Sequence, residues 1–171
     1  MLVIYSKLNI STEGREWIEA IRRRHDPQHH FIPAHFTFVF PFSGLAADDV
    51  LTAAGPVVDA TPPIRFRLSR AAGVKDPLDE RSRLFLLPTE GADEMVALNA
   101  RLYAGCLAAH RHPTLQFRPH VTVGAFSTQQ DAETAAADLD RFDIPGELES
   151  LFLADFDGHA IADLHELRFG H

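Results

Sequence analysis

The sequence PAHFTFVFPF, residues 33–42, is the stretch that decides the fold. Phenylalanine takes every second position in it, at Phe36, Phe38, Phe40 and Phe42. This period of two is typical of a β-strand with one face on a hydrophobic core, so we expect the phenylalanines to be buried. His35 and Thr37 then leave the opposite face of the strand together, about 7 Å apart along it.

A second stretch, RPHVTVGAF at residues 118–126, repeats this pattern. His120 and Thr122 have the spacing of His35 and Thr37, apolar residues alternate with them, and a proline closely precedes each copy. If the two strands lie in lobes related by a pseudo-two-fold axis, their polar faces converge on one cleft. A structural histidine beside a proline would explain one copy, but it would have to arise twice, each time with its threonine.

The rest of the chain alternates between strand and helix patterns in two comparable halves. Strands are expected at residues 2–9, 64–74 and 83–88, besides 35–42 and 120–126, and helices at 11–26, 46–60, 91–111 and 128–143. Residues 147–169 are expected to form a hairpin that turns at Asp157–Gly158, a strong turn signal between strand patterns. This order predicts an α+β fold with antiparallel sheet, as one domain of two lobes over residues 1–171.

The composition excludes several classes of protein. A net charge of −8 disfavours binding to extended nucleic acid, which depends on neutralising many phosphates. A small anionic ligand in a locally basic cleft remains compatible with that charge. No stretch is long and apolar enough to cross a membrane, and the N-terminus does not resemble a signal peptide. We therefore expect a cytoplasmic protein with no membrane partner.

Cysteine and histidine usage bear on metal and redox chemistry. The single cysteine, Cys106, excludes an internal disulfide and a cysteine-based zinc site, and we expect a small buried side chain there. Ten histidines point to proton or metal chemistry. His25 and His29 have a metal-ligand spacing, but Pro27 between them is expected to end the helix, and a clear third ligand is lacking. We expect solvated positions for His159, His165 and His171, and no metal or cofactor.

Two imidazoles and two hydroxyls on one cleft suit the cleavage of a phosphodiester. One histidine can deprotonate the incoming oxygen and the other can protonate the departing oxygen, because the pKa of histidine lies near neutrality. Thr37 and Thr122 can donate hydrogen bonds to the non-bridging phosphate oxygens.

The paired HFTF at residues 35–38 and HVTV at residues 120–123 resemble the signature of the two-histidine (2H) phosphoesterases. That superfamily includes the RNA 2′,3′-cyclic phosphodiesterases, also called 2′-5′ RNA ligases. The separation of the two copies, the α+β order and the RPHVTV context are also similar to that family.

The resemblance implies two lobes of antiparallel sheet with flanking helices, with one His-x-Thr motif of each lobe on a central cleft. It implies metal-independent opening of a 2′,3′-cyclic phosphate, on an RNA end or a small nucleotide, to leave a 2′-phosphate. His35 would then be the acid to the 3′ oxygen and His120 the base, although the two-fold symmetry leaves these roles interchangeable at this stage.

Further side chains are candidates for substrate contacts. Arg118 shares a strand face with His120, where it either binds the phosphate or pairs with a surface carboxylate. Tyr5 and Phe126 are candidates for stacking on a base. Arg81 and Arg83 flank a charged loop, where they either line the cleft entrance or are solvated.

Two other functions remain open from the sequence. The chain could run the reaction in reverse, as a ligase that forms a 2′-5′ bond between RNA ends. It could also be a binding module that captures a phosphorylated ligand with little turnover, although binding alone does not require a paired acid and base. In each case we expect a monomer whose partner is a small nucleotide or an RNA end.

Overall fold

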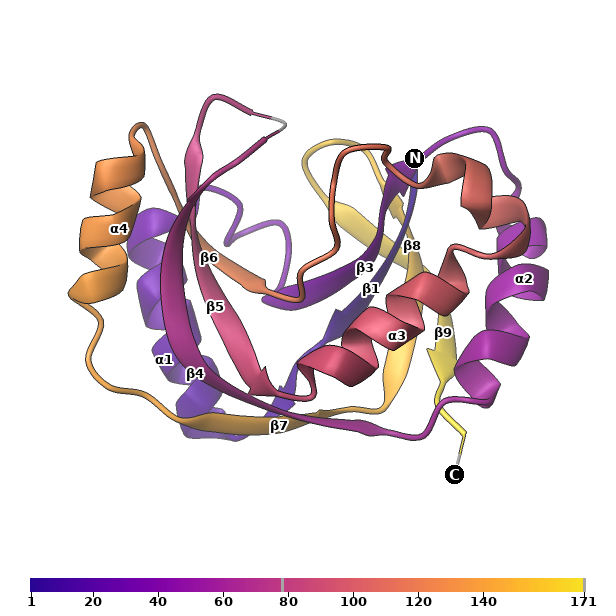
Figure 1. Cartoon of the computed structure of the whole chain (residues 1–171), viewed down its shortest axis with the longest axis horizontal. Helices are drawn as coiled ribbons and strands as arrows, with labels where there is room; N and C mark the ends of the chain where they lie inside the picture. The colour runs from indigo at the N-terminus through magenta and orange to yellow at the C-terminus, as the bar shows by residue number, and fades with distance from the viewer. Residues whose placement is uncertain (78, 171) are drawn as a thin grey trace.

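Two antiparallel sheets carry the fold of this protein, a computed structural model of which describes residues 1–77 and 79–170 (Figure 1). The first sheet has the strand order β3 (His35–Phe42), β1 (Leu2–Lys7), β8 (Ser150–Phe156) and β9 (Ile161–Arg168). The second sheet has the order β2 (Asn9–Ile10), β7 (Ile144–Leu148), β4 (Ile64–Lys75), β5 (Ser82–Glu90) and β6 (Val121–Phe126). The expected α+β fold of two antiparallel lobes is confirmed.

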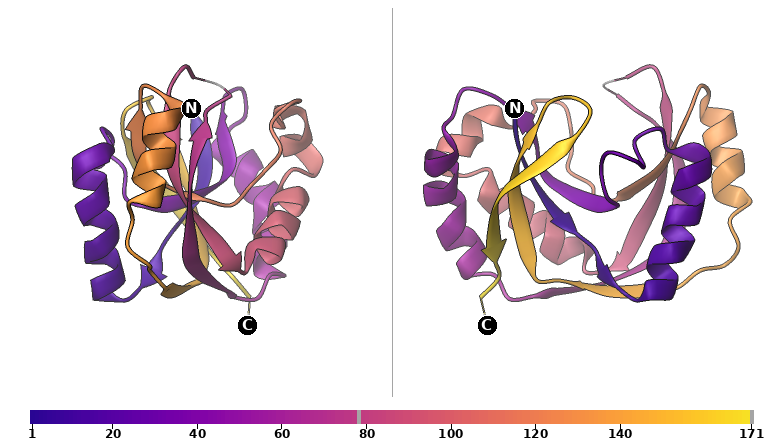
Figure 2. Two further views of the ribbon diagram at one scale, coloured as in Figure 1. Left: turned by 60° about the vertical axis from the view of Figure 1, so that its left-hand side comes forward. Right: turned by 180° about the vertical axis from the view of Figure 1, so that it is seen from behind.

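Helices flank both sheets. Helices α1 (Thr12–His25) and α4 (Gln129–Ala137) pack on the second sheet, and α2 (Ala47–Asp59) packs on β8 and β9 of the first. Helix α3 (Ala92–Leu102) contacts strands of both sheets. The views in Figure 2 show α1 and α4 at one end of the molecule and α2 and α3 at the other.

The hydrophobic core is continuous between the two sheets, because their buried faces meet. Phe36 of β3 and Phe66 of β4 are buried and pack edge to face, with ring centroids 5.3 Å apart. Val121 and Val123 of β6 are buried in the same cluster. The apolar residues of both motifs therefore anchor their strands in one shared core.

The lobes do not coincide with the two halves of the chain. Strand β1 belongs to the first sheet, and after Leu8 the chain enters the second sheet as β2. It returns to the first sheet for β3, enters the second again with β4, and crosses a last time at Glu149, between β7 and β8. Each sheet is therefore built from segments at both ends of the sequence.

Both motif strands bulge directly after their threonine. In β3 the pairing with β1 shifts beyond Thr37, and Phe38 and Val39 are then both buried. In β6 the pairing with β5 shifts beyond Thr122. A bulge reverses the alternation of side chains that follows it, so Phe40 lies half-buried against a pocket. The expectation that Phe40 enters the core is wrong for this reason.

Other boundaries also differ from expectation. The expected helix over 91–111 ends at Leu102, and a separate 3-10 helix, η1 (Gly105–His110), follows with Gly105 at a φ of 61°. Cys106 lies on this turn and is exposed, so the prediction of a buried thiol is wrong. The sequence patterns do not predict strand β7, and the terminal hairpin closes through a longer loop in which Asp157 accepts bonds from the backbone of His159 and Ala160.

Candidate active site

A pocket of about 320 Å³ opens between the two sheets, and both motifs line it. His35 and Thr37 reach it from β3, and Thr122 from β6, with His120 immediately before that strand. Strands β3 and β6 contact each other across the boundary between the sheets. The convergence expected from the doubled sequence is therefore present in the structure.

Both histidine rings are oriented by a hydrogen bond to a backbone carbonyl. Nδ1 of His35 lies 2.7 Å from the carbonyl oxygen of Pro33, and Nδ1 of His120 lies 2.7 Å from that of Arg118. A carbonyl oxygen can only accept, so Nδ1 carries a proton and donates in both cases. The neutral tautomer is thereby fixed, and Nε2 of each ring is the nitrogen left for a ligand.

Burial sets the protonation of both rings. Burial lowers the pKa of His120 to about 4, and the neighbouring charges of His35 and Arg118 act in the same direction, against the bond to the Arg118 carbonyl. Burial also lowers the pKa of His35 below its usual value, and the Arg22 guanidinium contributes further. Both rings are therefore neutral at pH 7 in the free protein.

The two threonines complete the polar lining. Thr37 and Thr122 are half-buried. Within residues 1–77 and 79–170, neither hydroxyl has a hydrogen-bond partner. Each can therefore donate to a ligand oxygen without breaking an existing bond.

An aromatic ring from the neighbouring strand lies against each histidine. Tyr5 of β1 pairs with Thr37, and its ring meets His35 edge-on with centroids 5.5 Å apart. Phe85 of β5 pairs with Thr122, and its ring stacks on His120 at 3.8 Å. These rings desolvate the imidazoles and restrict their orientation.

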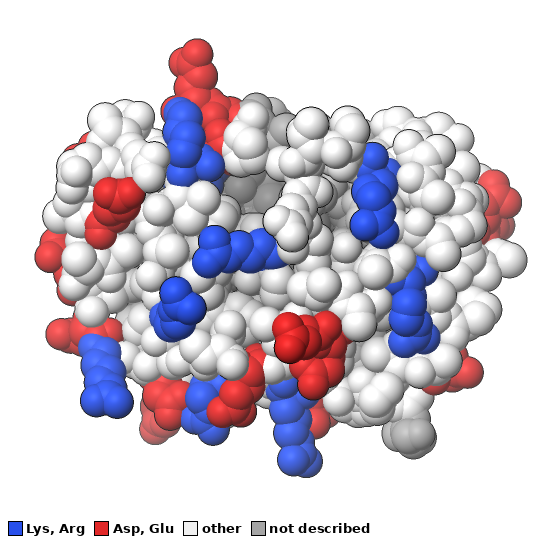
Figure 3. Space-filling model, in the orientation of Figure 1, with Lys and Arg blue, Asp and Glu red and all other residues white. Residues whose placement is uncertain are grey.

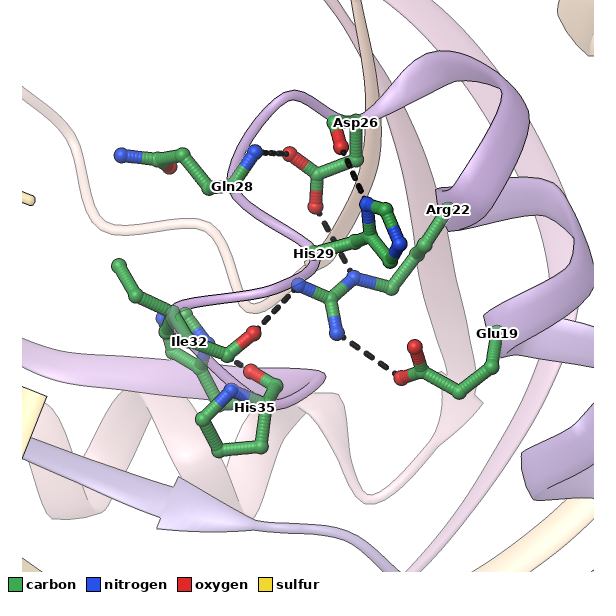
Figure 4. A network of polar contacts seen from close by, with 8 residues as sticks. Glu19, Arg22, Asp26, Gln28, His29, Ile32 and His35 are labelled. Atoms are coloured by element: carbon green, nitrogen blue, oxygen red, sulfur yellow. Dashed lines mark hydrogen bonds and ion pairs between the residues drawn. The ribbon is translucent and has the colours of Figure 1, made fainter. Parts of the chain in front are cut away.

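An arginine–carboxylate pair also lies beside each histidine. Arg22 is 2% exposed, and it binds Asp26 through Nε at 2.9 Å and the carbonyl of Ile32 through Nη2 at 2.5 Å (Figure 4). Ile32 directly precedes Pro33, so this network fixes the segment whose carbonyl orients His35. On the other side, Arg83 of β5 binds Asp76 through Nε at 3.1 Å. All four charged residues of these pairs line the pocket.

The structure places the remaining predicted residues outside the lining of this pocket. Arg118 is exposed and orients His120 through its carbonyl, and its predicted contact with phosphate stays a prediction. Tyr5 is 1% exposed and donates its hydroxyl proton to Asp163 at 2.6 Å, so it offers no free face to a base. Phe126 lines a neighbouring cavity together with Arg81.

Several side chains on or beside the pocket are not placed there by the sequence patterns. Phe85 and Arg83 share the strand face opposite the buried Leu84 and Leu86, and this alternation in RLFLLP could have placed them on the pocket. Phe40 could not have been placed, because it lies there only as a result of the bulge. No local sequence pattern shows that Arg22 bonds to Ile32, ten residues away.

The described residues provide neither a metal cluster nor a membrane-spanning helix. Over residues 1–77 and 79–170, no group of three or more His, Cys, Asp or Glu side chains is arranged to hold a metal ion. Within the same residues, no helix is both long and apolar enough to cross a membrane.

Two histidines fixed by their backbone, two threonine hydroxyls and a shared pocket form the candidate active site of this chain. The 2′-5′ RNA ligase superfamily profile matches residues 10–160, and the chain belongs to this family.

A Bacillus pumilus (strain SAFR-032) protein named "Putative phosphoesterase" is 33% identical over 60% of this chain. A Geobacillus thermodenitrificans (strain NG80-2) protein of the same name is 24% identical over 64%. The matches span 57% and 61% of those relatives.

Solved structures share the fold over the whole chain. TT0787 of Thermus thermophilus superimposes with a TM-score of 0.68, 18% identity and full coverage of both chains. Escherichia coli LigT complexed with NADP⁺ gives a TM-score of 0.61 at 18% identity, covering 99% of this chain and 97% of LigT. The LigT complex with 3′-AMP gives 0.58 at 17% identity, covering 99% and 98%.

Proposed function

We propose that this protein opens 2′,3′-cyclic phosphates, at RNA ends or on small nucleotides, by general acid–base catalysis without a metal, and leaves a 2′-phosphate. One observation carries the proposal: His35 and His120 line the same pocket, and each is held through Nδ1 so that Nε2 remains for the reaction. A paired acid and base is what phosphodiester hydrolysis requires and what simple capture of a ligand does not.

The two halves of the site take complementary roles in one displacement. Water attacks phosphorus as Nε2 of His120 accepts its proton, and a new P–O bond forms. The bond from phosphorus to the 3′ oxygen breaks, and that oxygen takes the proton carried on Nε2 of His35. The product is a 2′-phosphate beside a 3′-hydroxyl, and proton exchange with solvent resets the pair.

Phosphate binding supplies the protonated acid. Burial keeps both imidazoles neutral in the free protein, but an anionic phosphate between them favours a charged ring and raises its pKa. Mutual repulsion between two charged rings then favours the state with one proton on the pair. Hydroxyls of Thr37 and Thr122 would hold the non-bridging oxygens, where charge increases in the transition state.

Turnover of a nucleoside 2′,3′-cyclic phosphate in excess EDTA tests the proposal. We expect hydrolysis to a 2′-phosphate at a rate unaffected by EDTA, and loss of this activity in His120→Ala. The matched control is His165→Ala, an exposed histidine on β9 outside the pocket. Loss of hydrolysis in EDTA, or a wild-type rate in His120→Ala, would contradict the proposal, and tight binding without turnover would favour a binding module.

A further inference from the structure

Two buried polar side chains at the end of α3 take no part in the reaction proposed above. Polar residues of a helix normally face solvent, and on the face of the molecule drawn in Figure 3 the charged side chains lie dispersed over the surface. Asn99, near the end of α3, and Tyr103, directly after it, are instead only 3% and 6% exposed. Side chains four positions apart share one face of a helix, and both of these bond to the backbone of β3.

Strand β3 is the edge strand of the first sheet, so backbone groups on its outer side need partners other than a strand. The Asn99 side chain donates through Nδ2 to the carbonyl oxygen of Phe38 at 2.6 Å. The backbone N–H of Phe40 donates to the hydroxyl oxygen of Tyr103 at 3.2 Å. The end of α3 thus supplies the donor and the acceptor that a further strand would have provided.

These two bonds lie on either side of the bulge in β3. On β1, Tyr5 pairs with Thr37. The preceding residue of β1, Ile4, pairs with Val39, so Phe38 is the extra residue of the bulge. A bulge leaves its extra residue unpaired in the ladder and redirects the side chains around it. The position of the bulge therefore decides which side chains of β3 face the pocket, and the two bonds from α3 hold that position.

The bulge also decides what the pocket contains. Thr37 directly precedes the extra residue, Phe40 follows two positions after it, and both line the pocket. Phe40 lines in addition a small cavity of about 20 Å³ together with Asn99 and Tyr103, so it lies between the helix and the pocket. An O–H···O hydrogen bond spans only about 2.5–3.0 Å, so a small movement of β3 would take the Thr37 hydroxyl out of range of a phosphate oxygen.

We propose that Asn99 and Tyr103 are positioning residues for the reaction, because they hold the bulge of β3 where it aims the Thr37 hydroxyl at a non-bridging oxygen of the phosphate. The inference rests on the proposed function, in which that oxygen gains charge in the transition state. An interaction that strengthens in the transition state acts on kcat more than on KM. Loss of either bond to β3 should therefore lower kcat and leave KM almost unchanged.

The first test measures hydrolysis of a nucleoside 2′,3′-cyclic phosphate. Tyr103→Phe keeps the ring and removes the acceptor, whereas Asn99→Leu keeps the approximate shape and removes the donor. We expect each to lower kcat by about tenfold, with KM within about twofold of the wild type. The matched control is Thr61→Val, which removes a buried hydroxyl that bonds to Val57 and to Arg101, neither of which belongs to β3. If Asn99→Leu does not fold, Tyr103→Phe carries the test alone.

A comparison of double variants separates positioning from a general loss of stability. In a Thr37→Val background the hydroxyl is already gone, so adding Tyr103→Phe should lower kcat by less than about twofold further. In a Thr122→Val background the same substitution should keep its full effect of about tenfold, because that hydroxyl lies on β6. Equal effects in the two backgrounds, or a wild-type kcat in Tyr103→Phe alone, would overturn the inference.

The methyl group of Thr37 reports the same geometry without turnover. In a ¹H–¹³C NMR spectrum of the free protein, its resonance should shift in Tyr103→Phe and stay in place in Thr61→Val. If the wild type hydrolyses no cyclic phosphate, the proposed function fails, while a shifted Thr37 resonance still supports the control of this hydroxyl by α3. A Thr37 resonance that does not move in Tyr103→Phe would overturn the inference, whatever the activity.

Discussion

The two halves of the site repeat one plan, but they are not held equally firmly. Each half has a histidine bonded to the carbonyl two residues before it, a threonine hydroxyl, a bulge and an aromatic ring opposite the threonine. In the half that contains His35, the ring of Tyr5 is tied to Asp163. In the half that contains His120, Phe85 has no polar atom with which to form such a bond.

The arginine–carboxylate pairs beside the two histidines also differ, in how far they are buried. The side chains of Arg22 and Asp26 are 2% and 6% exposed, whereas those of Arg83 and Asp76 are 20% and 22% exposed. The first half is therefore integrated into the interior, and the second is closer to solvent. The reacting groups are therefore pseudo-symmetric, while the residues that support them are not.

Replacing each histidine in turn should have the largest effect on kcat and should separate the roles of the two halves. On a cyclic phosphate, His35→Ala and His120→Ala should each lower kcat by about 10²–10⁴-fold, the usual contribution of a general acid or base. An aryl phosphodiester has a leaving group that departs without a proton. On that substrate we expect His35→Ala, which lacks the acid, to recover to within about tenfold of the wild type, while His120→Ala stays impaired.

The leaving-group experiment is measured by release of the aryl alcohol, with His165→Ala as the control. Recovery of His120→Ala instead of His35→Ala would reverse the two roles. Equal loss by both variants on both substrates would contradict a separate acid and base.

Replacing the arginine of each ion pair should lower the free energy of unfolding by unequal amounts. Arg22→Met leaves Asp26 buried without its ion pair, so we expect a loss of about 3–5 kcal/mol in the free energy of unfolding. Arg83→Met breaks a more solvated pair and should cost about 1 kcal/mol or less. Urea unfolding followed by circular dichroism measures both values, and equal losses would show that the two pairs support the fold to the same degree.

A smaller effect should appear in the pH dependence of kcat/KM, which reports on both histidines. The free-enzyme pKa values of both histidines are lowered by burial, to about 4 for His120, so the optimum should lie below pH ~6.5. Above the optimum the acid loses its proton, and kcat/KM should fall by about tenfold per pH unit. An optimum at or above neutral pH would contradict this assignment.

A variant beside His120 adds a directional test. Phe85→Ala exposes one face of His120 to water, which relieves the desolvation and should move the acidic limb of the profile to higher pH. Tyr5→Phe keeps the ring beside His35 and should leave that limb in place. A shift of equal size in both variants would mean that the rings do not act separately.

Local patterns in the sequence predict the elements that carry the site. The alternation in residues 35–38 and 120–123 correctly places the buried residues of both motifs, and Ser11 caps α1 as its side chain suggests, accepting from the backbone of Gly14 at 3.1 Å. These features depend on residues close in sequence, where propensity and periodicity act directly.

Long-range contacts decide the features that could not be predicted. Strand β7 contains Pro145 and Gly146, which disfavour strands, yet Gly146 is required because a Cβ there would overlap Phe66. Helix α3 stops at Leu102, and the hydroxyl of the next residue, Tyr103, accepts a hydrogen bond from the backbone of Phe40 at 3.2 Å. Such contacts join residues that only the folded chain brings together.

The crossing of the chain between the sheets has a consequence for how the protein is made. Strand β1 lies between β3 and β8, and Val3 pairs with Ala154. On the ribosome, one edge of β1 must therefore wait unpaired until residues 150–156 have emerged, and an unpaired edge invites association with other chains. Neither half of the gene would encode a self-sufficient half of the site, because each lobe is completed by the opposite end of the polypeptide.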